Sequence, residues 1–155
     1  MTESREPIEV VRAVKALTIE GQELVSVVEE ASREKELPSA FAESLRYYSR
    51  DVEWDMGPRW AGIGIGHYRG HAGIAKFWTD FLAVFSEFRV KTVSLAEAGD
   101  QVVCEAELSF TTRNGLTMEG RQGEIWTVRD GEVTRLRLFE DREAAVAALD
   151  SPAGL

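Results

Sequence analysis

Residues 126–149 read WTVRDGEVTRLRLFEDREAAVAAL and combine two strand-like runs with a helix-like one. Asp130-Gly131 separates the two strand-like runs. An Asp-Gly pair in this position is a strong hairpin signal, because glycine accepts the positive φ that a tight turn demands. The alanine-rich acidic run that follows favours a helix. The stretch therefore predicts an antiparallel hairpin closed by a helix.

The same hairpin carries charged and aromatic residues at alternating positions. Glu124 alternates with Trp126, and Arg135 alternates with Arg137 and Phe139. Alternating residues of a strand share one face of the sheet. A face that combines a carboxylate, guanidinium groups and aromatic rings is typical of a pocket wall, so the hairpin predicts a small-molecule cavity.

The composition is that of a globular protein without a basic surface. The chain has 155 residues, and we expect one domain over 1–155, with a loose start over 1–6 and an extended helical start over about 7–49. The net charge of −9 disfavours binding to nucleic acid or to an anionic membrane surface. No apolar run is long enough to span a membrane and no signal peptide opens the chain, so we expect a cytoplasmic protein.

Cysteine and histidine are too scarce to suggest a metal centre. Cys104 is the only cysteine, and it alternates with apolar residues, which indicates a small buried side chain. His67 and His71 are four residues apart, but Gly66 and Gly70 argue against the helix that would bring them to one face. We expect neither a metal nor another cofactor.

Hydrophobic periodicity divides the chain into helices first and strands later. Helical spacing extends from Pro7 to about Val28 and again from a cap at Ser39 to Tyr48, and a short strand covers 51–56. The glycine-rich segment 57–70 is expected to be a long loop that packs down through its apolar residues, and a third helix follows from Gly70. Strands are expected at 88–98, 101–112, 116–129 and 132–139, and a helix at about 141–149. This order predicts an α+β fold in which a curved antiparallel sheet packs on N-terminal helices and encloses a pocket.

Several short motifs resemble the SnoaL-like group of the nuclear transport factor 2-like superfamily. They are DVEW at 51–54, YRGHAGI at 68–74, FW at 77–78, WTVRDGEV at 126–133, REAA at 142–145 and the final GL at 154–155. The resemblance covers about 45–155, with extra residues around 29–44. It implies a cone-shaped ketosteroid isomerase-like fold, commonly a homodimer through the outer face of the sheet. Relatives with this fold include polyketide cyclases, isomerases, epoxide hydrolases, dehydratases and binding domains without activity.

The resemblance also points to a candidate acid or base. Glu124 stands where the similar isomerases and cyclases often place a pocket aspartate, and burial among aromatic rings would raise the pKa of its carboxyl group. Tyr68 or His67 would then polarise an oxygen of the substrate. The position of the isomerase base is matched most nearly by Met56, with Asp55 one residue away. If Glu124 is the acid or base, Glu124→Gln should abolish turnover and change stability by no more than about 1 kcal/mol, because the swap is nearly isosteric. In the alternative, Glu124 is a structural carboxylate paired with Arg137 or Arg135 across the hairpin.

Arg137 has two interpretations that the alternation leaves open. In the first, Arg137 points into the cavity and steadies a developing negative charge. In the second, Arg135 and Arg137 lie on an outer face, and Leu136 and Leu138 face the core. Aromatic and apolar residues are expected to line the ligand site, although a helical aromatic stripe can also be plain core: Trp54, Met56, Phe77, Trp78, Phe81, Trp126 and Phe139.

We therefore expect a domain that binds a small hydrophobic molecule in an apolar cone, on the scale of a polyketide, terpenoid or steroid. Its enzymatic form would be proton-transfer catalysis of the isomerase, cyclase or dehydratase type. The alternative is a ligand-binding or dimerising module with no activity. A further alternative is a domain that binds a partner through its acidic outer surface.

Overall fold

The computed structural model describes residues 6–18, 39–61 and 64–150. The second half of the expected first helix and the final GL motif lie outside these residues. The described elements follow this order: α1 (Pro7–Thr18), α3 (Ser39–Ser44), the 3₁₀ turn η1 (Leu45–Tyr47), β1 (Tyr48–Asp55), α4 (Pro58–Ala61), β2 (His67–Arg69), α5 (Gly70–Val84), β3 (Phe85–Ala98), β4 (Gln101–Thr112), β5 (Thr117–Arg129), β6 (Glu132–Phe139) and α6 (Arg142–Ala147).

One strongly curved sheet organises the chain, and its strand order is β2-β1-β6-β5-β4-β3. Strands β3 to β6 form an antiparallel meander. β1 pairs antiparallel with β2 but parallel with β6. The sheet is therefore mixed, whereas antiparallel pairing alone was expected. The reason is that the neighbour of β1 on this side is the last strand, β6, which runs parallel to it.

The hairpin between β5 and β6 has the expected tight turn. Asp130 has φ 53° and Gly131 has φ 77°. Two successive positive φ values are typical of the type I′ turn, whose twist matches that of the flanking strands. Next to the turn Arg129 pairs with Glu132, and a register shift between Thr127 and Val128 then places Trp126 opposite Leu136 and Glu124 opposite Leu138.

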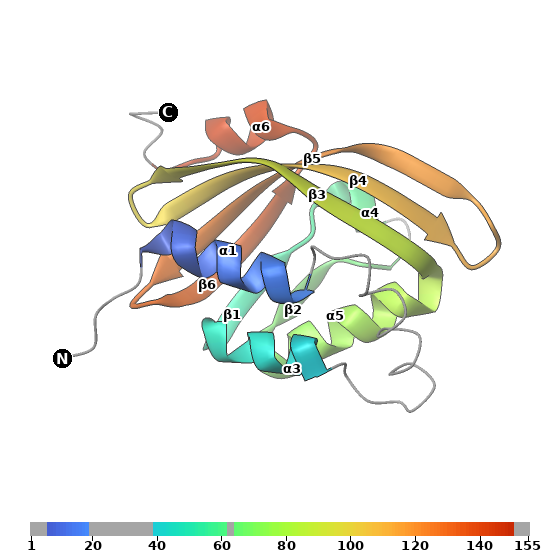
Figure 1. Ribbon diagram of the computed structural model, residues 1–155, viewed down its shortest axis with the longest axis horizontal. Coiled ribbons are helices and arrows are strands. Elements are labelled where there is room, and N and C mark those ends of the chain that lie inside the picture. The colour runs from blue at the N-terminus through green and yellow to red at the C-terminus, as the bar shows by residue number, and fades with distance from the viewer. Residues whose placement is uncertain (1–5, 19–38, 62–63, 151–155) are drawn as a thin grey trace.

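Helices cover both faces of the sheet unequally (Figure 1). α1, α3 and α5 lie on the concave side, whereas α6 lies on the convex side against β5 and β4. Gly123 permits the approach of α6, because a Cβ at this position would collide with the backbone of Asp141. α6 covers the convex face of β5, and the helices on the concave side, including α1, cover the other face (Figure 1). Ile125 and Trp126, which alternate along β5, are therefore both fully buried.

The segment 57–70 is more regular than the long loop expected from its glycines. Pro58 begins the short helix α4, where a proline costs no hydrogen bond, and Trp60 on this helix is buried. β2 then adds to the sheet edge by pairing Tyr68 with Trp54. β4 and β6 have the bounds expected from the sequence.

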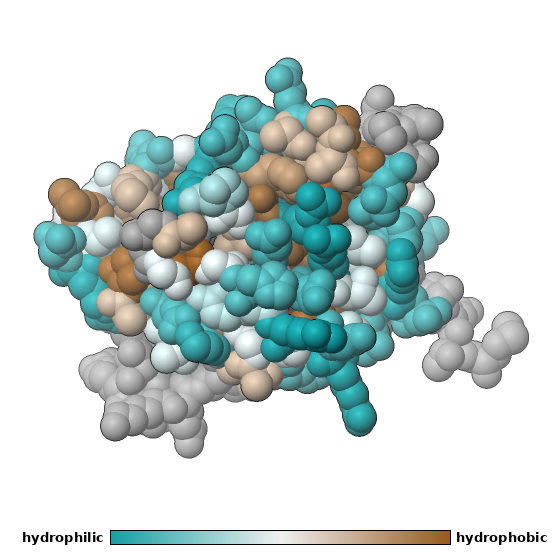
Figure 2. Space-filling view, turned by 180° about the vertical axis from the view of Figure 1, so that it is seen from behind, coloured by the Kyte–Doolittle hydropathy of each residue, from teal (hydrophilic) through white to brown (hydrophobic). Residues whose placement is uncertain are grey.

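Hydrophilic residues predominate on the back of the molecule (Figure 2). Figure 2 shows the back of the molecule largely in teal, with a pale brown area near the top where the alanine-rich α6 lies. The convex face of β3–β5 beyond α6 carries charged residues, including Arg89, Lys91 and Arg121. A homodimer through this face stays a prediction. No helix of the described residues is long and apolar enough to cross a membrane.

Candidate functional site

A cavity of about 70 Å³ lies between the concave face of the sheet and helices α4 and α5. We call it the inner cavity. It is lined by 13 apolar residues and by the polar pair Gln122 and Glu124; the apolar residues are Trp54, Met56, Trp60, Phe77, Trp78, Phe81, Phe88, Val90, Leu108, Phe110, Trp126, Leu136 and Leu138. All four tryptophans of the chain are among them.

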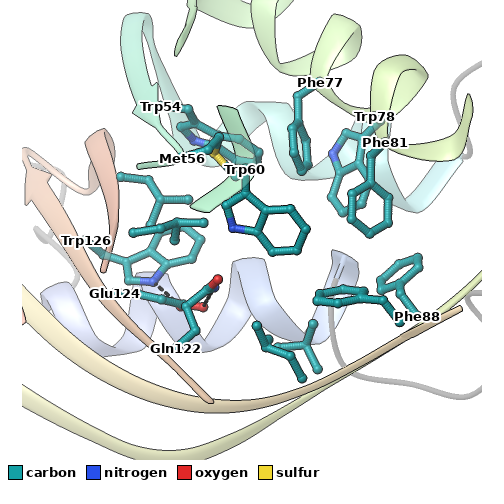
Figure 3. Close-up of a pocket in the computed structure, with 15 residues that line it drawn as sticks. Trp54, Met56, Trp60, Phe77, Trp78, Phe81, Phe88, Gln122, Glu124 and Trp126 are labelled. Carbon is teal, nitrogen blue, oxygen red and sulfur yellow. Dashed lines mark hydrogen bonds between the residues drawn. The ribbon is translucent and has the colours of Figure 1, made fainter. Parts of the chain in front are cut away.

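Strand alternation and helical spacing bring these side chains together. On β5, Gln122, Glu124 and Trp126 share the inward face, and on β6 Leu136 and Leu138 do so. On α5, Phe77 and Trp78 both lie about one turn before Phe81, as an amphipathic helix requires. Figure 3 shows the result: Gln122, Glu124 and Trp126 form a polar end of the inner cavity, and the rings of α5 and β3 form an aromatic end.

The aromatic walls are held mainly by edge-to-face contacts. The ring centroids of Trp54 and Phe77 are 5.0 Å apart with planes inclined by 68°. Those of Trp60 and Phe110 are 5.2 Å apart and inclined by 83°. Such pairs add about 0.5–1.5 kcal/mol each beyond the area they bury. These ring contacts stabilise the lining of the cavity, which offers a ligand both the edges and the faces of aromatic rings.

Glu124 is the buried carboxylate at the polar end, and its partner is Lys15 of α1. Lys15 Nζ donates to Glu124 Oε1 over 2.9 Å, with the two residues 1% and 2% exposed. Trp126 Nε1 donates to the same oxygen over 2.8 Å, and Gln122 Nε2 donates to Oε2 over 2.9 Å. The sequence suggested Arg135 or Arg137 as the structural partner, and this was wrong, because α1 supplies the cation from the cavity side of the sheet.

Both members of this pair are ionised. Burial is the largest influence on Glu124 and favours the neutral acid, but the charge of Lys15 and hydrogen bonds from Lys15, Trp126 and Gln122 outweigh it and lower the pKa of Glu124. Burial also favours neutral Lys15, but the charge of Glu124, with a smaller contribution from Cys104, raises the pKa of Lys15. A carboxylate in this state is a weak base and is not a proton donor at neutral pH.

Gln122 retains one free polar atom. Its amide nitrogen must face the Glu124 carboxylate, which can only accept, so Gln122 Oε1 is the remaining acceptor. This oxygen is buried and has no hydrogen-bond partner among the described residues. It can accept a bond from a ligand hydroxyl that reaches the polar end.

Tyr68 and His67 on β2 do not line the inner cavity. The Tyr68 hydroxyl donates to Asp80 Oδ2 over 2.8 Å, and burial together with this bond raises the pKa of Tyr68 to about 12. His67 alternates with Tyr68 and is exposed. The sequence-based role of polarising a substrate oxygen would therefore require either side chain to move.

Arg137 and Phe139 point away from the inner cavity, which corrects the expected placement of Phe139 and favours the second interpretation of Arg137. Leu136 and Leu138 face inward, so Arg137 and Phe139, which alternate with them, lie on the other face of the sheet. There the Arg137 guanidinium lies 5.0 Å from the centre of the Phe139 ring. Phe139 packs against the small core cluster beneath α6. Of the expected ligand-binding residues, Trp54, Met56, Phe77, Trp78, Phe81 and Trp126 do line the cavity.

His71 and Cys104 take part in packing and hydrogen bonding within the fold. His71 Nε2 lies 2.9 Å from the backbone oxygen of Tyr48, which ties the start of α5 to β1. Cys104 is buried opposite Glu124 on the neighbouring strand. Within the described ranges, no three histidine, cysteine or acidic residues lie close enough together to hold a metal ion.

Comparisons with known proteins agree with this architecture. The sequence model of the SnoaL-like domain matches residues 38–136. The crystal structure of TerC co-crystallised with polyporic acid is similar at a TM-score of 0.66 with 26% identity, covering 94% of this chain and 98% of TerC.

Two further solved structures show the same fold at lower identity. A nuclear transport factor 2-like protein of unknown function from Burkholderia pseudomallei has a TM-score of 0.67 and 16% identity, covering 94% of this chain and 98% of that one. A protein described as a SnoaL-like polyketide cyclase from Jannaschia has a TM-score of 0.60 and 17% identity, covering 100% and 99%. A comparison with curated proteins finds no match.

Proposed function

This chain belongs to the SnoaL-like family, and we propose that it binds a small cyclic molecule, largely apolar, in the inner cavity. The observation that carries this proposal is the lining, in which aromatic and aliphatic side chains surround a space with only one polar end. Ligand pockets in proteins have this character, with apolar walls and a few polar groups that fix orientation. The co-crystallisation of TerC with polyporic acid supports a small organic ligand.

The cavity volume limits the size of the bound group. About 70 Å³ is roughly half of the ~150 Å³ in which an engineered apolar cavity takes up benzene. One ring therefore fits after small side-chain shifts, whereas a complete steroid does not. Burial of about 150 Å² of apolar ligand surface contributes about 4 kcal/mol, so a bare ring should bind no more tightly than a Kd of about 1 mM once the cost of association is included.

Binding without turnover is the form of this function that the geometry favours. Glu124 is ionised and both of its oxygens accept hydrogen bonds from protein groups, which leaves it poorly suited to shuttle a proton. Proton-transfer catalysis is the second candidate. It is favoured by one observation, the position of that carboxylate in the wall of an apolar cavity.

Intrinsic fluorescence tests the binding proposal directly, because all four tryptophans line the inner cavity. Titration with toluene, phenol, cyclohexanol and polyporic acid is expected to change the emission saturably for the compounds that enter. Val90→Phe would fill the cavity and should abolish the change. Val93→Phe is the matched control on the same strand, where Val93 is 46% exposed.

The outcomes separate the two candidates. Saturable binding that Val90→Phe removes and Val93→Phe preserves supports the proposal. Absence of any saturable change across the panel, with the protein folded, overturns it. Deuterium exchange at acidic C–H positions of a bound ligand, lost in Glu124→Gln, would instead support proton transfer.

A further inference from the structure

A second space adjoins the inner cavity on the far side of Trp60. This outer groove has a volume of about 340 Å³ and is lined by Arg59, Trp60, Leu108, Phe110, Met118, Glu119 and Gly120. Three of these, Trp60, Leu108 and Phe110, also line the inner cavity. The two spaces are thus separated by shared side chains, and together they reach the lower end of the 300–1,000 Å³ typical of ligand pockets.

Arg59 holds a positive charge at the groove in a fixed position. Its Nη1 donates to the backbone oxygen of Arg121 over 2.8 Å, and its Nη2 donates to that of Glu140 over 2.9 Å. Both partners are neutral carbonyls, so neither cancels the charge. None of the ion pairs found within the described ranges involves Arg59, and the groove residue Glu119 is not within ion-pair distance of it.

The remaining donors of Arg59 are arranged for an anion. A guanidinium has five N–H donors, and two of them are used by the two carbonyls. Arg59 is an exposed residue, so a ligand can approach it from solvent. A planar fork held at both ends matches the geometry of a carboxylate, and less ordering entropy is lost when it binds one.

We infer that the ligand is an amphiphilic anion with a cyclic apolar end, a flexible chain and a terminal carboxylate. The ring occupies the inner cavity, the chain passes Trp60 into the outer groove, and the carboxylate binds Arg59. This inference rests on the proposed binding of a ring in the inner cavity. Gly120 leaves the groove open, since a Cβ at this position would meet no atom within 4 Å.

A homologous series tests chain length and charge together. Phenylalkanoates from benzoate to 6-phenylhexanoate are compared with the alcohols of equal length, by tryptophan fluorescence and calorimetry at low salt. Affinity is expected to rise with chain length to an optimum, where the carboxylate binds roughly two- to fivefold more tightly than the alcohol. Added salt should shrink this advantage.

Arg59→Gln should remove the carboxylate advantage and leave the affinity for toluene unchanged. Arg113→Gln is the matched control, because Arg113 is also exposed and also donates to a backbone oxygen, that of Leu82 over 2.7 Å. Gly120→Leu fills the groove without removing a contact and should abolish the dependence on chain length.

The results distinguish failure of this inference from failure of the proposed function. If toluene binds but carboxylates gain nothing over alcohols, or keep their advantage in Arg59→Gln, the inference is wrong and the ring-binding proposal stands. If Gly120→Leu leaves the optimum length unchanged, the chain does not use the groove. If no ring compound binds, both proposals fail.

Discussion

Replacement of Lys15 by methionine removes the cation from a carboxylate that water does not reach. Methionine retains most of the apolar stem of lysine, so the change isolates the charge. Glu124 would keep its hydrogen bonds from Gln122 and Trp126 but lose the partner 2.9 Å away. Breaking a buried pair on one side typically costs about 3–5 kcal/mol, a large share of the 5–15 kcal/mol that stabilises an ordinary domain.

Urea unfolding at pH 7, followed by tryptophan fluorescence, measures this cost as a shift of the transition midpoint. Lys76→Met is the matched control, because it breaks the exposed Lys76–Asp80 pair of 2.7 Å, in which Lys76 is 68% exposed. The control should cost less than about 1 kcal/mol. The double variant Lys15→Met/Glu124→Gln removes both buried charges and should recover much of the loss.

Two results would contradict this reasoning. A Lys15→Met protein as stable as Lys76→Met would show that the buried pair contributes no more than a surface pair. A double variant less stable than Lys15→Met would show that Glu124 is not strained by the loss of its cation. Either result would also remove the argument that Lys15 keeps Glu124 ionised.

Three further predictions follow from the same structure. The pKa of Glu124 is lowered from 4.5 and that of Lys15 is raised from 10.5, so the pair contributes its full stability between pH 4.5 and pH 10.5. The free energy of unfolding should fall as the pH drops from 4.5 through the lowered pKa of Glu124, and also as the pH rises from 10.5 through the raised pKa of Lys15. Both dependences on pH should flatten in the double variant Lys15→Met/Glu124→Gln. Gly123→Ala should lower stability by about 1–3 kcal/mol through overpacking beneath α6, whereas Gly120→Ala on the same strand, where a Cβ meets nothing, should be nearly neutral in thermal unfolding. Trp60→Ala should widen the passage between the inner cavity and the outer groove and cost about 3–5 kcal/mol in stability. In fluorescence titration the variant should bind two-ring compounds that the wild type excludes, and unchanged size selection would show that Trp60 does not limit the passage.

Local chemistry was sufficient to predict the frame of the fold. The Asp130-Gly131 turn required two positive φ values, and the alternation on either side of it gave the bounds of β6. The segment around Trp60 was misread as loop because glycine and proline signals dominate there. The expected packing of its apolar residues is confirmed for Trp60, which is buried, but the single helical turn that carries Trp60 was missed.

The site was less accessible from the sequence, because a period of two shows which residues share a face but not which face is inside. The sequence therefore left Arg137 open between the cavity and the outer face, and the leucines flanking it were the better guide to the core. Lys15 was missed for a different reason. It lies four residues after Val11 and so on the buried face of α1, and its partner is 109 residues away. A lysine within an apolar helical stripe was the available signal.

The sequence model of the family matches only residues 38–136, and parts of the fold on both sides of this span support the site. The counter-charge for Glu124 comes from before that span, and the helix that seals the back of its strand comes from after it. A fragment limited to residues 38–136 would leave Glu124 without its cation and the outer face of β5 without the cover of α6. Shortened proteins for ligand-binding experiments should therefore retain both α1 and α6.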